Sequence, residues 1–350
     1  MHAGGTQVRI RLSNAYGSAP VRLTGATIAQ STTGAGVQPG TVRVLRFGHG
    51  EQTVVPVGRS VVSEPAALRV TALDALAITL YFKTPSGPAT FHQDGLTTTY
   101  RADGDHRYDL GSASFRGETS HSRYFITGVD VSGAGAPPGA VVAFGDSITD
   151  GHGSTAGADN RYPDQLAELL LRSGRHVSVV NAGIGGNKLL ADSPCYGERA
   201  VTRFDRDALS QPGVRTVVVL VGVNDIGAGG YPDYFGCGAS REVSAPDLIA
   251  AHRQLIRSAH RVGVRVVGAT VTPMKNFTGY YSAEKEAVRD QLNSWIRGGG
   301  EYDAVVDLDR LLADPKDADA LAAPFDSGDG LHLNDAGADL IARAVSRALR

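Results

Sequence analysis

From residue 140 to the C-terminus of the 350-residue chain, short apolar runs alternate with segments of helical periodicity. We expect strands at 141–145, 177–181, 215–222, 264–271 and 304–308. We expect amphipathic helices at about 162–173, 197–209, 246–262, 283–297 and 334–349. The run Thr216–Val221 is apolar almost throughout, which is typical of a strand buried on both faces. The alternation therefore predicts an α/β fold with a doubly wound parallel sheet and helices on both of its faces.

Residues 6–132 have a different pattern, in which short strands are separated by clusters of Gly, Pro, Ser and Asn. Gln7–Leu12 alternates apolar with polar residues, as a half-buried strand does. Further strands are expected at 21–28, 41–47, 53–57, 68–70, 77–82 and 124–131. Because no convincing helical period interrupts them, the pattern predicts an all-β, jelly-roll-like sandwich. The Gly- and Pro-rich linker 133–139 then separates a β-domain at 1–132 from an α/β domain at 140–350.

Composition argues against two classes of partner. The formal net charge is -2 at pH 7, so the chain has no basic field for nucleic acid or an anionic membrane surface. No apolar run approaches the ~20 residues that span a bilayer, so no membrane span is expected. Residues 1–6 lack the basic and apolar segments of a signal peptide, and the strand pattern begins at once, as it would after loss of a leader.

Small and polar residues follow the expected strands at the end where an α/β sheet binds its ligands. The first strand ends in Gly-Asp-Ser at 145–147, and the second in Asn-Ala-Gly-Ile-Gly-Gly at 181–186. The third ends in Gly-Val-Asn-Asp at 222–225. Asp329 and His332 precede the last helix. We expect these segments to meet on one rim of the sheet, and this convergence carries more weight than the Gly-Asp-Ser tripeptide alone.

Taken in order, these four segments resemble the sequence blocks of the SGNH (GDSL-type) hydrolases, and the resemblance covers about 140–350. The stretch Arg-Leu-Ser-Asn-Ala-Tyr-Gly at 11–17 is similar to the N-terminal β-domain of some bacterial members. The resemblance implies a three-layer, flavodoxin-like α/β/α domain after the β-domain. It also implies a serine esterase that needs no cofactor, and it favours an exported protein.

The chemistry of an esterase can be argued from the residues themselves. A serine hydroxyl is a weak nucleophile until a base takes its proton, and we expect Ser147 as nucleophile and His332 as base. Asp329 lies three residues before His332, which is close enough for its carboxylate to reach the imidazole Nδ1–H. The residues around Ser147 do not form the Gly-x-Ser-x-Gly elbow of the α/β-hydrolases.

Acyl transfer also needs donors for the oxyanion of the tetrahedral intermediate. The resemblance implies three donors: the backbone N–H of Ser147, the backbone N–H of Gly186 and the side-chain amide of Asn224. Gly185 is the alternative to Gly186 if the turn is shifted by one residue.

Other residues near these segments have competing interpretations. Asp146 and Asp225 are interpreted as structural residues, and Asp307, Asp309 and Asp326 as polar residues outside the triad. His152 either lines the site or is a solvated loop residue. Rim aromatic residues form either a wall for an acyl or sugar group or a surface loop: Phe277, Tyr280 and Tyr281. No ligand-like spacing predicts a metal site among the histidines of the β-region, which include His92, His106 and His121.

The expected substrates are short-chain acyl esters, including acetyl esters on carbohydrates. Two alternatives stay open: a lysophospholipase or thioesterase for longer chains, and a glycan-binding protein whose β-domain dominates function. Cys195 and Cys237 both lie in loop sequence, where they form either one disulfide or two free thiols. The sequence leaves the oligomeric state open.

Overall fold

The computed structural model describes residues 1–233 and 236–350 of the chain. The described residues divide into two compact units, Met1–Pro137 and Pro138–Arg350. The division falls within the segment 133–139 that the sequence marks as a linker. No helix in the described part of the chain is long and apolar enough to cross a membrane.

The first unit is built from antiparallel strands, and residues 1–137, all of which are described, contain no helix. Its strands are β1 (Gly5–Ser13), β2 (Val21–Leu23), β3 (Gly25–Gln30), β4 (Arg43–Leu45), β5 (Thr53–Val55), β6 (Ser60–Val62), β7 (Ala66–Val70), β8 (Leu76–Tyr81), β9 (Phe91–His92), β10 (Arg123–Tyr124) and β11 (Ile126–Ser132). The prediction of a β-rich region with antiparallel strands is confirmed, whereas the jelly-roll topology stays a prediction.

The strand β1 shows how alternation builds the core of this unit. Val8, Ile10 and Leu12 are buried, whereas the polar residues between them are more exposed. β1 pairs with β11, β6 and β7, while β3 pairs with β4 and β8. Apolar residues of both groups of strands contribute to one hydrophobic core. The two-residue period therefore places one face of each strand inside.

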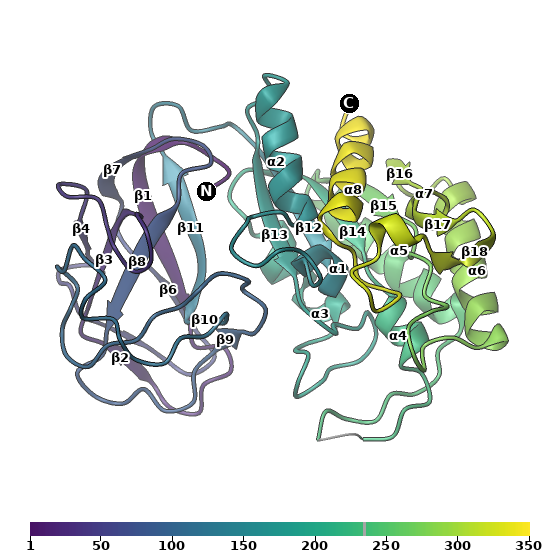
Figure 1. The fold of residues 1–350 in the computed structure, drawn as a ribbon, viewed down its shortest axis with the longest axis horizontal. Coiled ribbons are helices and arrows are strands. Elements are labelled where there is room, and N and C mark those ends of the chain that lie inside the picture. Colours follow the sequence, from purple (N-terminus) through teal and green to yellow (C-terminus); the bar gives the residue numbers. More distant parts are fainter. Residues whose placement is uncertain (234–235) are drawn as a thin grey trace. The chain divides into compact units, whose positions relative to one another are not determined.

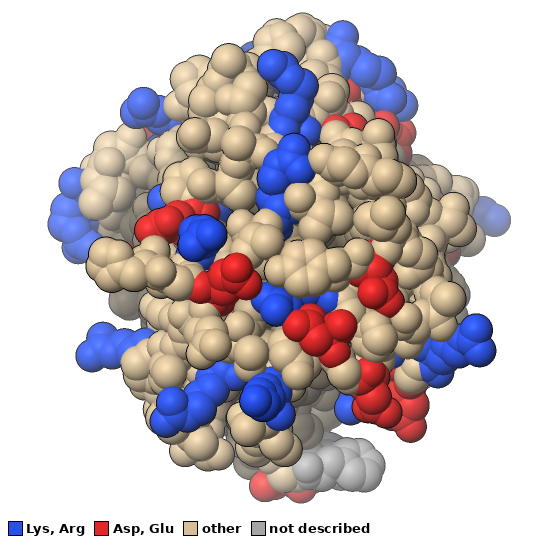
Figure 2. All heavy atoms as spheres, turned by 90° about the vertical axis from the view of Figure 1, so that its left-hand side faces the viewer, with Lys and Arg blue, Asp and Glu red and all other residues tan. Residues whose placement is uncertain are grey.

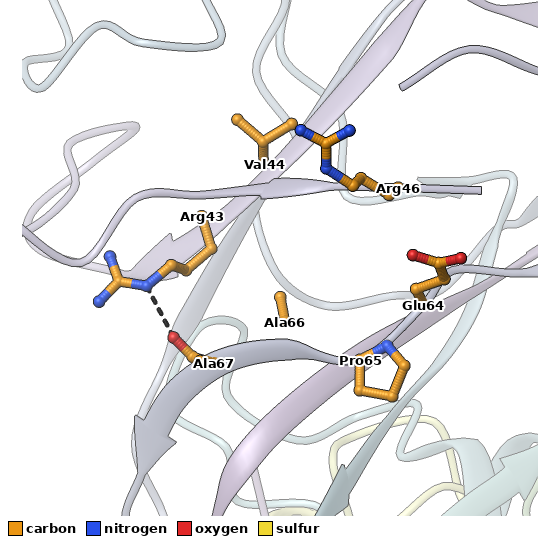
Figure 3. A pocket seen from close by; sticks show the side chains of 7 residues that line it. All are labelled: Arg43, Val44, Arg46, Glu64, Pro65, Ala66 and Ala67. Carbon is orange, nitrogen blue, oxygen red and sulfur yellow. Dashed lines mark hydrogen bonds between the residues drawn. The ribbon is translucent and has the colours of Figure 1, made fainter. Parts of the chain in front are cut away.

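One face of the first unit and one pocket on its surface can be described in terms of what they could bind. Lys and Arg are interspersed with Asp and Glu on the face drawn in Figure 2, so that face has no field of a single sign. A surface pocket lies beside β4 and the start of β7, and Arg43 there donates to the backbone carbonyl of Ala67 at 2.7 Å (Figure 3). None of its seven lining residues is aromatic, so the pocket offers no ring on which a sugar could stack.

The second unit alternates strands with helices. Its strands are β12 (Ala140–Gly145), β13 (Ser178–Gly183), β14 (Val214–Leu220), β15 (Arg265–Ala269), β16 (Ala304–Val306), β17 (Ala313–Asp314) and β18 (Asp317–Leu321). Its α-helices are α1 (Ser147–Asp150), α2 (Tyr162–Arg172), α3 (Ala200–Phe204), α4 (Val223–Gly227), α5 (Ala245–Arg261), α6 (Ala283–Gly298), α7 (Leu308–Leu312) and α8 (Asp335–Ala348). The expected helix at 197–209 is α3 followed by a π-helical turn, Asp205–Leu209.

Five parallel strands form the main sheet of this unit in the order β13-β12-β14-β15-β16, and β17 pairs with β18 in a separate antiparallel pair (Figure 1). Every residue of β12 is buried, because this strand lies between two others and under helices. α2 packs against α8, whereas α5 packs against α3 and α6, and the two groups cover opposite faces. β13 is added on one side of β12 and the later strands on the other, and ligands of such sheets bind at the carboxyl ends of the strands beside this switch.

Sequence signals set the ends of several helices. The side chains of Ser244, Ser282 and Asn334 cap the first turns of α5, α6 and α8. Asp247 completes a capping box with Ser244. The predicted α/β fold with a parallel sheet is confirmed in this unit.

Candidate active site

Ser147 lies at the carboxyl end of the buried strand β12 and is the first residue of the short helix α1. The Asp146 side chain caps this helix by accepting the Ile148 N–H at 3.1 Å. A Cβ on Gly145 would overlap the backbone of Leu220 and the side chain of Thr149, so the strand requires glycine at its end. Strand and cap together hold the Ser147 hydroxyl at the sheet rim, where the residue is 5% exposed.

His332 approaches Ser147 from a distant part of the chain. Its Nε2 lies 2.8 Å from Ser147 Oγ, and its Nδ1 lies 2.6 Å from Asp329 Oδ2. Because a carboxylate only accepts hydrogen bonds, Nδ1 carries the proton and Nε2 accepts from the Ser147 hydroxyl. The structure thus joins the three residues in one chain of hydrogen bonds.

Asp329 is held by the loop that also carries His332. Its Oδ1 accepts the backbone N–H groups of Leu331 at 2.9 Å and of His332 at 2.8 Å. Partial burial would raise the pKa of Asp329, but the hydrogen bonds from the His332 ring and backbone and from Leu331 hold it below its usual value. Asp329 is therefore ionised at neutral pH and can stabilise a protonated imidazole.

Backbone donors flank the nucleophile. Gly185 donates its N–H to Asp150 at 3.1 Å. The N–H groups of Ser147 and Gly186 donate to no other group within the described residues. Gly186 has a positive φ of 69°, and a Cβ there would overlap the ring of Tyr196. Of the two glycines that the sequence leaves open, Gly186 is the one with an uncommitted N–H.

Asn224 lies at the start of α4 and is 4% exposed. Its Nδ2 donates to the carbonyl of Asn187 at 3.0 Å, which connects α4 to the residue after Gly186. Its Oδ1 accepts the hydroxyl of Tyr280 at 2.9 Å. The sequence suggested Tyr280 only as a wall or a surface residue, so this contact is a finding of the structure.

Two buried carboxyl groups support the rim without joining the triad. Asp225 accepts the backbone N–H of Leu189 at 2.7 Å and of Leu190 at 2.9 Å, and burial raises its pKa to about 6. Burial also raises the pKa of Asp146 to about 7, and the neighbouring Asp225 adds to this rise. Oδ2 of Asp146 is buried and accepts no hydrogen bond from the described residues. Both side chains therefore have structural contacts, as the sequence suggested.

Arg203 of α3 is a residue that sequence reasoning missed. It is 1% exposed, and its guanidinium donates to the carbonyls of Gly145 at 2.7 Å and Ala182 at 2.8 Å. It also donates to Asn187 Oδ1 at 3.0 Å and stacks on the Phe144 ring, 4.2 Å from its centroid. Arg203 shares one face of α3 with Ala200 and Phe204, and this spacing could have indicated that it is buried.

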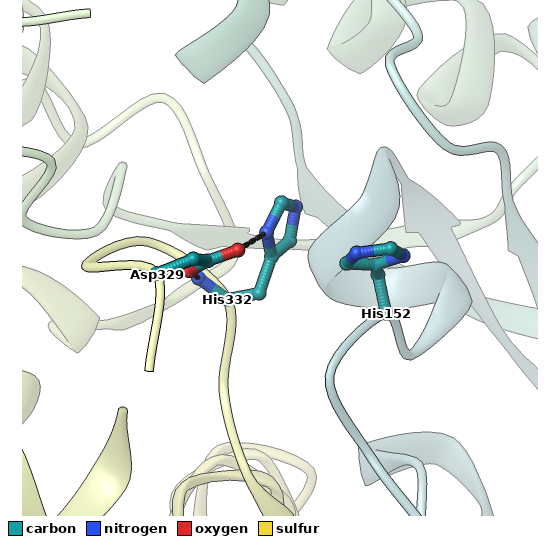
Figure 4. A group of neighbouring side chains, drawn as sticks. All are labelled: His152, Asp329 and His332. Atoms are coloured by element: carbon teal, nitrogen blue, oxygen red, sulfur yellow. Dashed lines mark hydrogen bonds and ion pairs between the residues drawn. The ribbon is translucent and has the colours of Figure 1, made fainter. Parts of the chain in front are cut away.

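Two rings flank His332. The ring of His152 lies 4.4 Å from the His332 ring and that of Phe277 5.8 Å from it, both edge-on. His152 follows α1, and Asp329 and His332 lie on the loop before α8 (Figure 4). Ligand atoms of His152, Asp329 and His332 lie within 4.8 Å of one another, a grouping that could hold a divalent cation. A cation bound there would take up His332 ring nitrogens that otherwise contact Ser147 and Asp329. That the enzyme works without a metal stays a prediction.

The remaining acidic candidates lie in other contacts. Asp307 pairs with Arg297, and Asp309 pairs with Arg297 and Arg289. Asp326 accepts the N–H groups of two glycines in the His332 loop, at positions 328 and 330. Tyr281 donates to Asp319 at 3.3 Å, whereas the adjacent Tyr280 donates to Asn224.

Cys195 and Cys237 form a disulfide with a Cα–Cα distance of 5.1 Å. The Ser193 hydroxyl donates to the carbonyl of Cys237 at 2.7 Å beside it. The bridge therefore joins two loops of the second unit, one of which carries Tyr196 over Gly186. The structure thus contains the disulfide, one of the two alternatives that the sequence left open.

Comparisons with known proteins bear on the second unit. The model of the GDSL-like lipase/acylhydrolase family matches residues 143–340. A search of curated proteins gives no match.

Among solved structures, a lipase/acylhydrolase from Enterococcus faecalis is similar at 20% identity and a TM-score of 0.45, covering 60% of this chain and 94% of that one. An acetyl xylan esterase is similar at 22% identity and a TM-score of 0.44, covering 60% and 99%. A carbohydrate acetylesterase family member from Sinorhizobium meliloti is similar at 15% identity and a TM-score of 0.46, covering 61% and 97%.

Proposed function

The chain belongs to the GDSL-like lipase/acylhydrolase family, and we propose that it hydrolyses carboxylic esters through an acyl intermediate on Ser147. The observation that carries this proposal is the chain of hydrogen bonds from Ser147 Oγ through His332 to Asp329. A hydroxyl that donates to an imidazole, which in turn donates to a carboxylate, is prepared for nucleophilic attack.

In the proposed mechanism, Ser147 Oγ attacks the ester carbonyl while His332 Nε2 takes the hydroxyl proton. Asp329 stabilises the imidazolium that forms and keeps the ring in one orientation. The tetrahedral intermediate collapses when His332 returns the proton to the leaving alcohol. Water then attacks the acyl-serine with the same base, which releases the carboxylic acid and restores Ser147.

Three donors are proposed for the oxyanion: the N–H groups of Ser147 and Gly186 and the amide Nδ2 of Asn224. The two backbone groups donate to no described residue, and Nδ2 has a second hydrogen besides the one bound by Asn187. Donors that are oriented before the reaction stabilise the developing charge without further reorganisation.

The proposed substrates are short acyl esters, with acetyl groups on carbohydrates among them. The rings of His152 and Phe277 flank the base, and Tyr196 packs over Gly186. These rings are compact and can stack on a sugar, which supports a short acyl group on a carbohydrate.

We also propose that the two parts of the chain have different roles. Residues 140–350 would form the catalytic domain, and residues 1–132 an accessory β-sandwich joined to it by the linker 133–139. The Cys195–Cys237 disulfide supports an exported protein, because disulfides persist in oxidising compartments.

The test is Ser147→Ala, assayed with p-nitrophenyl esters from acetate to decanoate. We expect a loss of roughly 10⁴-fold or more in kcat for the variant, and a wild-type preference for the shortest chains. Ser154→Ala is the matched control, since that hydroxyl donates to the Gly151 carbonyl in the loop after α1. Activity that survives Ser147→Ala would refute the mechanism. Preference for the decanoate would instead favour a lysophospholipase or thioesterase.

A further inference from the structure

Asn224 is bound from two sides by partners of different chemistry. The Asn187 carbonyl faces Nδ2 at 3.0 Å, and the Tyr280 hydroxyl faces Oδ1 at 2.9 Å. A backbone carbonyl can only accept, so the amide atom beside it must be the nitrogen. The oxygen must then face Tyr280, whose hydroxyl donates to it. The two contacts together allow one orientation of the amide.

The phenol of Tyr280 can make this donation throughout the pH range of an ester assay. Burial raises its pKa above the ordinary value, and neighbouring groups that can be negative, including Tyr231 and Asp146, add to the rise. Tyr280 therefore stays protonated.

Close packing holds the Tyr280 ring in place. Its centroid lies 4.7 Å from that of Phe277 in an edge-on contact and 6.3 Å from that of Tyr231. A Cβ on Gly227 would overlap the Tyr280 ring, so only a glycine at this position lets α4 pack so closely against it. The hydroxyl is thus delivered by a rigid side chain.

The other partner of Asn224 is also held firmly. Asn187 donates from its side chain to the carbonyls of Tyr196 and Glu198, at 2.9 and 2.8 Å, and accepts from buried Arg203. Asn187 is fully buried, and Tyr280 is partly buried and packed between rings, so neighbouring groups hold both partners of Asn224 in place.

We propose that Tyr280 is a positioning residue of the oxyanion site, which locks the Asn224 amide with its second N–H available to the substrate oxygen. This inference rests on the proposed function and extends it to a residue outside the triad and its donors. Without the hydroxyl, Oδ1 would be a buried acceptor without its donor, and the amide could rotate. An amide turned around would present an oxygen to the negative oxyanion and repel it.

The experiment is a double-mutant cycle with Tyr280→Phe, Asn224→Ala and the double variant, using p-nitrophenyl acetate. Rates are expressed per active site titrated with a fluorophosphonate, so that a misfolded fraction lowers the number of sites and not kcat. Tyr281→Phe is the matched control, because it removes a hydroxyl that binds Asp319 instead.

We expect Asn224→Ala to lower kcat by about 100- to 1,000-fold and Tyr280→Phe by about 10-fold or more, with KM nearly unchanged. In the Asn224→Ala background, Tyr280→Phe should have almost no further effect, since Tyr280 acts through the amide. Tyr281→Phe should resemble the wild type.

An unchanged kcat in Tyr280→Phe would overturn the inference, and so would the same fold-loss with and without Asn224. If Ser147→Ala is inactive while Tyr280→Phe behaves as wild type, only the positioning role fails. If Ser147→Ala keeps full activity, the proposed function itself fails.

Discussion

The nucleophile and the base of this site are supported in different ways. The nucleophile rim, defined here as residues 145–150, 182–190 and 224–225, is held by side chains far away in sequence. Arg203 reaches the Gly145 carbonyl across 58 residues, and Asp225 reaches Leu189 across 36. The histidine loop, residues 326–333, is held mainly by its own members. The rim therefore depends on the packing of the whole unit, and the loop depends on local sequence.

The acidic groups of the two regions also differ, in the direction in which their surroundings shift the pKa. In the rim, burial raises the pKa of Asp146 to about 7 and of Asp225 to about 6. In the loop, local hydrogen bonds outweigh burial and hold the pKa of Asp329 below its usual value. A carboxyl group that serves a histidine must be ionised, whereas one that caps a buried turn can keep its proton.

Among the groups that support the nucleophile and the base, the largest effect is expected from Asp329→Asn in the histidine loop. The asparagine oxygen can still accept the N–H groups of Leu331 and His332, so the loop should keep its fold. Its amide nitrogen, however, would favour the wrong tautomer of His332, and kcat should fall by about 10³- to 10⁴-fold. Steady-state kinetics measure this loss. Asp326→Asn in the same loop is the control, and near-normal kcat in Asp329→Asn would exclude Asp329 from the mechanism.

The next effect concerns the packing of the rim. Arg203→Met removes buried donors from the carbonyls of Gly145 and Ala182, and we expect it to lower the free energy of unfolding by about 2–4 kcal/mol. Arg206→Met is the control, because the Arg206 side chain is 46% exposed and its ion pairs are worth at most about 1 kcal/mol. Denaturant unfolding of both variants measures the difference. Equal losses would contradict the long-range support assigned to the rim.

A smaller effect should appear in the pH dependence of stability. The folded protein holds the Asp146 proton up to about pH 7, whereas the unfolded chain releases it near pH 4. Unfolding therefore releases a proton between these values, so the stabilisation is complete below pH 4 and is lost as the pH rises through 7. Relative to Asp146→Asn, the wild type should lose on the order of 1–3 kcal/mol between pH 4.5 and 8.

Urea unfolding across this pH range measures how the free energy of unfolding changes with pH in the wild type and in Asp146→Asn. Only the two slopes are compared, so a pH-independent loss of stability caused by the asparagine does not affect the test. Because Asp225 titrates in the same direction, the variant should keep part of the slope. Parallel curves for wild type and variant would show that Asp146 is ionised in the folded protein at both ends of the range.

Sequence reasoning succeeded where the signal was local or periodic. Alternating runs predicted the parallel sheet, and polar residues at strand ends predicted where Ser147 and Asn224 would lie. It could not choose between Gly185 and Gly186, because the choice depends on a hydrogen bond from Gly185 to Asp150. It also passed over Arg203, which is 1% exposed in the folded protein.

The sequence by itself determined the alternation of the five parallel strands with the longer helices and the three-residue spacing from Asp329 to His332, because both follow from neighbours along the chain. Only the tertiary structure decided which side chains hold the nucleophile rim. Tyr280 meets Asn224 across 56 residues of sequence, and Arg203 meets Gly145 across 58. Such contacts have no period and no fixed spacing. They exist only after packing has brought a buried donor to the one acceptor within its reach.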